Sequence, residues 1–202
     1  MSALTDEPAG WDHVQPAAAR RLLTGAVAAF AERGYQATTT RDIASRAGMS
    51  PAALYVHYPS KERLLFEISR SGHVAALDVL RAADATGSTP ADRLRAMVAA
   101  FTTWHAEHHT IARVVQYELA SLSPDHLAEV AAIRRDISHS IERVLADGVA
   151  DGSFAVPDVP GTALAVLSLS IDVARWFTGG RRQSPAGLGA LYADLALRMV
   201  TP

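Results

Sequence analysis

Stretches rich in Ala and Leu with helical spacing follow one another along almost the whole chain, and this pattern restricts the fold most. Glycine and proline lie mainly between these stretches, where they end helices. The alternating Val, Ile and Thr runs and the Asn-Gly turns that indicate strands and hairpins are scarce. The sequence therefore predicts an all-α protein with about nine helices.

The predicted helices follow a loose tail over residues 1–15. Pro16 suits the first turn of the first helix, and Gly34 is expected to end it. The expected ranges are 16–33, 40–47, 51–58, 60–83, 91–108, 110–122, 124–151, 160–178 and 185–200. We divide the chain into a helix-turn-helix domain over residues 16–62 and a larger helical domain over residues 63–202.

Composition excludes several classes of function. The 202 residues include no cysteine, so disulfides, thiolate zinc sites and cysteine nucleophiles are ruled out. No apolar run reaches the roughly 18 residues that a membrane-spanning helix needs. The first residues have neither a basic start nor an apolar core, so they do not form a secretory signal. A cytoplasmic protein without a membrane partner is expected.

Charge is distributed unevenly along the chain. Residues 16–63 carry seven basic and three acidic residues, a net charge of +4, whereas the whole chain has a net charge of −2. A locally basic segment on an acidic remainder indicates an anionic polymer as the partner of that segment. An uneven surface charge without function is the alternative.

Residues 39–58 have the pattern of a helix-turn-helix. Thr39 and Ser50 can each cap a short helix, and Pro51 suits the first turn of the second one. Gly48 supplies the tight turn between them, and Leu54 is expected to face inward. In this motif the second helix enters the major groove of DNA. The residues that we expect to contact DNA are Thr39, Thr40, Arg41, Ser50, Pro51, Ala52, Ala53, Tyr55, His57, Tyr58 and Lys61.

Residues 16–65 resemble the DNA-binding domain of the tetracycline-repressor (TetR) family of transcriptional regulators. The matching segments are ERGY, TTTRDIA, AGMSPAALY and HYPSKERLL. The resemblance implies an all-α homodimer, most often a repressor, whose N-terminal domain reads an operator and whose C-terminal domain binds a small effector. Two differences are Tyr58, where phenylalanine is commoner, and alanine at both 52 and 53, where glycine or threonine is frequent.

The C-terminal domain is expected to hold the effector and the dimer interface. Its distal part, residues 142–177, resembles family members that sense acyl-CoA thioesters or steroid- and fatty-acid-derived catabolites. Candidate effector contacts are Trp104, His105, His108, Val115, Tyr117, Ile137, Ile141, Asp172, Arg175 and Trp176, and candidate partners of CoA phosphates are Arg134, Arg135, Arg175, Arg181 and Arg182. Candidate interface residues on the last two helices are Val166, Ser170, Val173, Leu188, Leu191 and Leu195.

Two other functions stay open at this point. His105, His108 and His109 have helical spacing that can bind a metal, which makes an all-α metal- or histidine-dependent hydrolase the alternative. The segment is not an HExxH motif, because Ala106 occupies the position of the glutamate. The helix-turn-helix could also bind another protein instead of DNA. We expect no catalytic residue, metal or cofactor.

Overall fold

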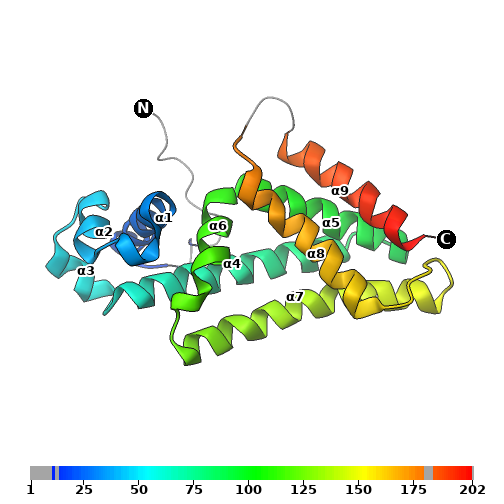
Figure 1. Cartoon of the computed structure of the whole chain (residues 1–202), viewed down its shortest axis with the longest axis horizontal. Helices are drawn as coiled ribbons and strands as arrows, with labels where there is room; N and C mark the ends of the chain where they lie inside the picture. Colours follow the sequence, from blue (N-terminus) through cyan, green and yellow to red (C-terminus); the bar gives the residue numbers. More distant parts are fainter. Residues whose placement is uncertain (1–10, 12–13, 180–183, 202) are drawn as a thin grey trace. The chain divides into compact units, whose positions relative to one another are not determined.

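The computed structural model describes residues 11, 14–179 and 184–201, which form nine α-helices and one short 3-10 helix (Figure 1). The described residues contain no strand, so the predicted all-α fold is confirmed. The helices are α1 (Ala17–Ala37), α2 (Thr40–Arg46), α3 (Pro51–His57), α4 (Lys61–Asp84), α5 (Pro90–Glu107), α6 (His109–Glu118), η1 (Leu119–Ser121), α7 (Pro124–Ala150), α8 (Val159–Trp176) and α9 (Pro185–Val200).

Two helices differ from the predicted ranges by more than two residues at one end. Helix α1 continues to Ala37, although Gly34 interrupts it with φ 77° and ψ 162°, a conformation outside the helical region. The helix predicted over residues 110–122 ends at Glu118 and continues as the 3-10 helix η1. Gly34 therefore kinks the backbone where the sequence predicted an end.

The helix starts follow local capping rules. The Thr89 hydroxyl accepts a hydrogen bond from the Asp92 N–H at 3.1 Å at the start of α5. Asp158 caps α8 through the Gly161 N–H at 3.0 Å, and Ser184 caps α9 in the same way. Each of these three helices has proline in its first turn. Proline has no N–H, and at this position no hydrogen bond within the helix is lost.

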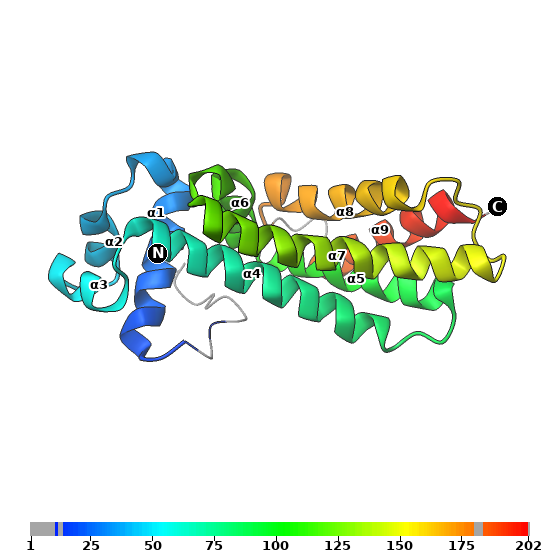
Figure 2. The same ribbon diagram turned by 90° about the horizontal axis from the view of Figure 1, so that it is seen from below.

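The chain divides into two compact units, and the first comprises residues up to Ala75 together with Thr110–Ala131. Figure 2 shows α1, α2 and α3 grouped at the start of α4. The core of this unit combines residues from α1 to α4 with Ile111, Val114 and Val115 of α6. The compact unit therefore does not end at residue 62, because α6 supplies part of its core.

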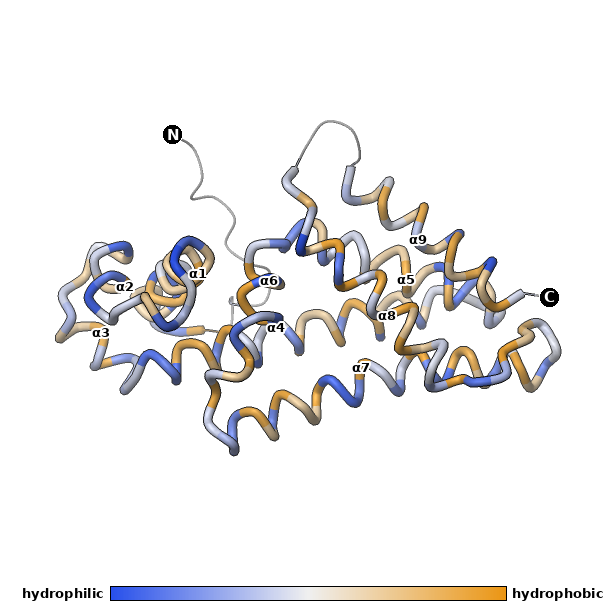
Figure 3. The backbone as a smooth tube through the Cα atoms, viewed as in Figure 1, coloured by the Kyte–Doolittle hydropathy of each residue, from blue (hydrophilic) through white to orange (hydrophobic). Residues whose placement is uncertain are grey.

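The second unit comprises Ala76–His109 and the residues from Ala132 onward. Helix α5 packs against α9 and α8, and a Cβ atom on Gly189 would lie only 2.5 Å from the Ala99 carbonyl oxygen. Glycine thus permits the close approach of α5 and α9. Hydrophobic residues run along both α8 and α9 (Figure 3). Among the described helices, none is long and apolar enough to cross a membrane.

Candidate nucleic-acid interface

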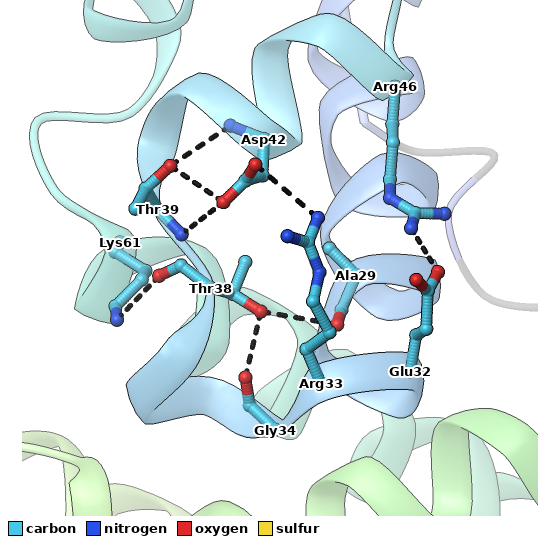
Figure 4. Close-up of polar contacts among 9 residues, drawn as sticks. All are labelled: Ala29, Glu32, Arg33, Gly34, Thr38, Thr39, Asp42, Arg46 and Lys61. Carbon is cyan, nitrogen blue, oxygen red and sulfur yellow. Dashed lines mark hydrogen bonds and ion pairs between the residues drawn. The ribbon is translucent and has the colours of Figure 1, made fainter.

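Local hydrogen bonds define the two short helices of the motif. The Thr39 hydroxyl accepts from the Asp42 N–H at 3.2 Å, and Asp42 Oδ2 accepts from the Thr39 N–H at 2.9 Å, which makes a capping box (Figure 4). The Ser50 hydroxyl accepts from the Ala53 N–H at 3.2 Å at the start of α3. Gly48 joins the helices with φ 66°, which favours glycine over any residue with a Cβ. The predicted caps and turn are confirmed.

The inner faces of α2 and α3 are buried in the core of the first unit. Ile43 of α2 and Leu54 of α3 are fully buried, and Ala47 after α2 is also buried. These residues were predicted to face inward because the spacing of apolar residues requires it. The burial holds α3 in one orientation and leaves its opposite face in solvent.

The exposed face of α3 holds most of the residues that were predicted to read DNA. Ser50, Pro51, Ala52 and Tyr55 are exposed, while Ala53 and His57 are partly buried. The side chain of Tyr55 lies with its hydroxyl 3.2 Å from the hydroxyl of Thr40, so it links α3 to the first turn of α2. Val56, beside Tyr55, is exposed as well.

Acidic neighbours already engage two arginines of this unit. Arg33 lies 3.3 Å from Asp42, and Arg46 pairs with Glu32 (Figure 4). Hydrogen bonds from the Thr39 side chain and backbone, more than Arg33, hold the pKa of Asp42 below its ordinary value. Arg41 is exposed in the first turn of α2 and has no ion pair among the described residues. Arg41 is thus a cation that a phosphate can reach.

Tyr58 does not occupy the position that a phosphate contact needs. Its side chain is buried, and its hydroxyl donates to the Ala19 carbonyl at 3.4 Å. Burial is the main cause that raises the pKa of Tyr58 to about 12, followed by the nearby Glu67 carboxylate. The predicted DNA contact of Tyr58 is corrected: this residue packs in the core of the first unit.

The Lys61 ammonium has partners within the chain. Its ammonium donates to the Tyr35 carbonyl at 2.7 Å and to the Thr38 carbonyl at 2.8 Å, and it lies 4.1 Å from the centroid of the Tyr35 ring. Burial lowers the pKa of Lys61, and the Glu118 carboxylate opposes that change. Two of its three N–H groups therefore already have partners within the chain.

The predicted effector residues are divided between the two compact units. Val115 and Tyr117 belong to the first unit, where Val115 is buried and Tyr117 is exposed. The others belong to the second unit, in which Trp104, His105, Ile137 and Ile141 are buried, His108 is partly buried and Trp176 is exposed. Asp172 accepts two hydrogen bonds from Arg175, at 2.7 and 2.9 Å. Arg181 and Arg182 lie outside the described residues.

The histidines of the alternative function do not converge on one point. The Nδ1 atoms of His105, His108 and His109 each lie near a different backbone carbonyl, at 2.8, 3.1 and 3.0 Å. The Trp104 ring stacks on His108, with centroids 4.9 Å apart. Within the described part of the chain, no three His, Asp or Glu residues are placed to hold a metal ion.

Four of the six predicted interface residues point into the chain. Val166, Ser170, Val173 and Leu188 are buried in the single chain, so this part of the prediction is corrected. Leu191 and Leu195 are exposed. Met199 of α9 is exposed as well, and the sequence analysis missed the exposed Leu164 and Leu169 of α8. Because these helices are apolar on more than one face, spacing alone did not identify the outer one.

Comparison with known proteins agrees with this geometry. Residues 22–68 match the family described as bacterial regulatory proteins, tetR family, and residues 87–200 match the tetracyclin repressor-like C-terminal domain. The HTH-type transcriptional repressor KstR2 of Mycolicibacterium smegmatis is 30% identical over 192 residues, which cover 93% of each chain.

Two solved structures extend the likeness to the whole fold. A regulatory protein of the tetR family from Rhodococcus RHA1 has a TM-score of 0.88 and 45% identity, covering 93% of this chain and 98% of that chain. The ketosteroid transcriptional regulator KstR2 of Mycobacterium tuberculosis has a TM-score of 0.85 and 27% identity, covering 94% of this chain and 97% of that one.

The helix-turn-helix and the helical C-terminal domain together define a one-component transcriptional regulator. The chain belongs to the TetR family. The predicted regulator is thereby confirmed. The hydrolase alternative has no support, because the matching families and relatives are transcriptional regulators.

Proposed function

We propose that the chain represses transcription by binding a palindromic DNA operator as a homodimer, and that a small effector releases it. The observation that carries this proposal is the exposed face of α3 from Ser50 to His57, held by the buried Leu54. Such a face suits the major groove, while the preceding helix crosses the phosphate backbone.

The residues divide into those that position the protein and those that read bases. Thr39, Thr40 and Arg41 lie at the start of α2, where hydroxyl groups and the Arg41 guanidinium suit contact with phosphate. Ala52 and Ala53 permit close approach to base edges, and alanine can contact a thymine methyl group. Tyr55 is the largest side chain of the exposed face and is suited to base contact.

A homodimer through α8 and α9 accounts for the exposed apolar side chains of these helices. Leu164, Leu169, Leu191, Leu195 and Met199 are all exposed in the single chain. A two-fold dimer also supplies the two readers that a palindromic operator requires, about one helical turn apart.

The proposed effector is an apolar molecule derived from a steroid or another lipid. The KstR2 relatives support this class, since KstR2 of Mycobacterium tuberculosis is a ketosteroid transcriptional regulator. An acyl-CoA thioester is a related candidate that also needs cations for its phosphates. Arg134 and Arg135 are both exposed on α7, and Arg175 on α8 is paired with Asp172.

The test is selection of operator fragments from random duplex DNA by the purified protein, followed by titration of steroid, fatty-acid and acyl-CoA candidates. Enrichment of a palindrome, with affinity that falls steeply as salt rises, supports the proposal. Absence of enrichment at low salt from protein freed of bound ligand would refute the proposed DNA contacts. Because binding is linked, the effector and the operator must weaken each other equally.

A further inference from the structure

The last turn of α1 follows the kink at Gly34 and leads through Thr38 into α2, and the Thr38 N–H donates to the Tyr35 carbonyl at 3.2 Å. Thr38 is buried, and its hydroxyl lies within hydrogen-bond distance of the Gly34 and Ala29 carbonyls, at 2.7 and 3.1 Å (Figure 4). Thr39 follows directly and begins the capping box of α2. The position of this connection therefore sets where α2 starts.

Two oppositely charged side chains hold the Tyr35 residue of this connection. Glu118, at the end of α6, accepts the Tyr35 N–H at 3.0 Å. Lys61, at the start of α4, donates to the Tyr35 carbonyl at 2.7 Å and to the Thr38 carbonyl at 2.8 Å. All these residues belong to the first compact unit. We call Lys61, Glu118 and the Tyr35 backbone between them the Tyr35 clamp.

The charges of the clamp suit a structural task. Hydrogen bonds from a charged group to a backbone carbonyl are stronger than neutral ones, and Lys61 adds such a bond to a Tyr35 carbonyl that already accepts the Thr38 N–H. The Lys61 ammonium also lies over the face of the Tyr35 ring, at 4.1 Å from its centroid, a cation–π arrangement. Lys61 is partly buried, whereas Arg41 on α2 is exposed.

We propose that Lys61 and Glu118 are positioning residues for operator binding, which hold the Tyr35–Thr38 connection so that Thr39 and Arg41 meet the phosphate backbone in register. This inference rests on the proposed DNA-binding role of α2 and α3. It assigns the direct phosphate contact to Arg41 and gives Lys61 an internal role. Glu118, an acidic residue, becomes a residue that DNA binding requires.

Salt dependence separates a positioning residue from a phosphate contact. Removing a phosphate contact lowers the slope of log affinity against log salt by about 0.9 per contact, or about 1.8 for a dimer with two readers. Removing a positioning residue lowers affinity by a similar factor at every salt concentration and leaves the slope unchanged. In a plot of log affinity against log salt concentration, a Lys61 variant therefore has a lower slope if Lys61 contacts phosphate and the wild-type slope if Lys61 is a positioning residue.

The first experiment measures operator binding by fluorescence anisotropy over a salt series for the wild type, Lys61→Met and Arg41→Gln. We expect Lys61→Met to weaken binding by at least about tenfold with an unchanged slope, because each chain loses two charged hydrogen bonds. Arg41→Gln should reduce the slope. A slope for Lys61→Met that falls as much as that of Arg41→Gln would overturn the inference, and unchanged affinity would also overturn it.

The second experiment asks whether replacing Glu118 strengthens or weakens DNA binding. Direct electrostatics predicts that Glu118→Ala strengthens DNA binding, because a negative charge is removed. The clamp predicts weaker binding at every salt concentration, with recovery in Glu118→Gln, whose side-chain oxygen can still accept the Tyr35 N–H. Tighter binding by Glu118→Ala, or equal affinity in all three proteins, would overturn the inference.

Two controls separate this inference from the proposed function. Thermal unfolding confirms that each variant is folded at the assay temperature, so that affinities refer to folded protein. If Arg41→Gln leaves the salt slope unchanged, the proposed DNA contacts fail, whatever Lys61 does. If Arg41→Gln lowers the slope and Lys61→Met lowers it equally, only the clamp fails.

Discussion

Replacing Leu191 on α9 with alanine should weaken the proposed dimer without unfolding the chain. The Leu191 side chain is 44% exposed in the single chain, so truncation leaves most of the internal packing in place. Its neighbour on the same helix, Leu188, is buried and packs with Ala106, Val173 and Phe177. The two leucines therefore separate an effect on association from an effect on folding.

The expected size follows from the exposed area. Burying a whole leucine side chain stabilises by about 1.5–3 kcal/mol, so covering the exposed 44% of Leu191 contributes about 1 kcal/mol per chain. A two-fold interface contains the residue twice, which gives about 2 kcal/mol for the dimer. Leu191→Ala should then raise the dimer dissociation constant by about thirtyfold.

Sedimentation velocity over a concentration series measures this constant directly. Leu127→Ala on α7 is the matched control, because Leu127 is the same residue type and is 39% exposed. We expect the control to dissociate as the wild type does, and both variants to keep the wild-type circular dichroism. Dimerisation unaffected by Leu191→Ala, or weakened equally by Leu127→Ala, would refute the assignment of the interface to α9.

Three further outcomes are expected. Leu54→Ala removes a fully buried side chain and should lower the free energy of unfolding by about 2–5 kcal/mol in urea titrations; a change under 1 kcal/mol would contradict its core role. Tyr55→Ala should keep the fold but change the sequences recovered by operator selection, and an identical selected site would exclude base reading. Burial opposes ionisation of Glu62, but hydrogen bonds from the Ser123 N–H and from His126 outweigh it and lower the Glu62 pKa. Because its pKa is lowered in the folded state, ionised Glu62 stabilises the fold at pH values above its ordinary pKa of 4.5. This contribution is lost as the pH falls through the folded pKa. The stability of Glu62→Gln should therefore fall less in acid than that of the wild type.

The parts of the interface that could be predicted are those that short-range rules decide. Thr39 and Ser50 cap helices through N–H groups three residues away, and Gly48 supplies a turn that needs a positive φ. Leu54 faces inward because the spacing of apolar residues on so short a helix permits only one face to be buried. Each of these features depends on a few adjacent residues, so the sequence contains the information needed to predict them.

Lys61 and Tyr58 could not be assigned in this way, because their partners are distant in sequence. Lys61 donates to carbonyls 26 and 23 residues earlier, and Tyr58 donates to a carbonyl 39 residues earlier. Both lie beside the exposed reader in sequence, and both have polar groups suited to phosphate. Only the packing of α1 against this segment, which no local pattern encodes, decides that these groups face inward.

The position of Glu118 suggests how an event elsewhere in the chain can reach the reader. Glu118 ends α6, and Lys61 begins α4, so two different helices meet at the Tyr35 residue. Helix α4 continues into the second compact unit, and α6 follows directly after α5 of that unit. A ligand can shift an equilibrium only through states that it binds differently. If effector binding alters either helix, the Tyr35 N–H or carbonyl must lose a partner or move with it, so hydrogen exchange at the Tyr35 amide should change when effector binds. Unchanged exchange there, in protein that releases DNA, would show that the signal reaches α2 and α3 by another route.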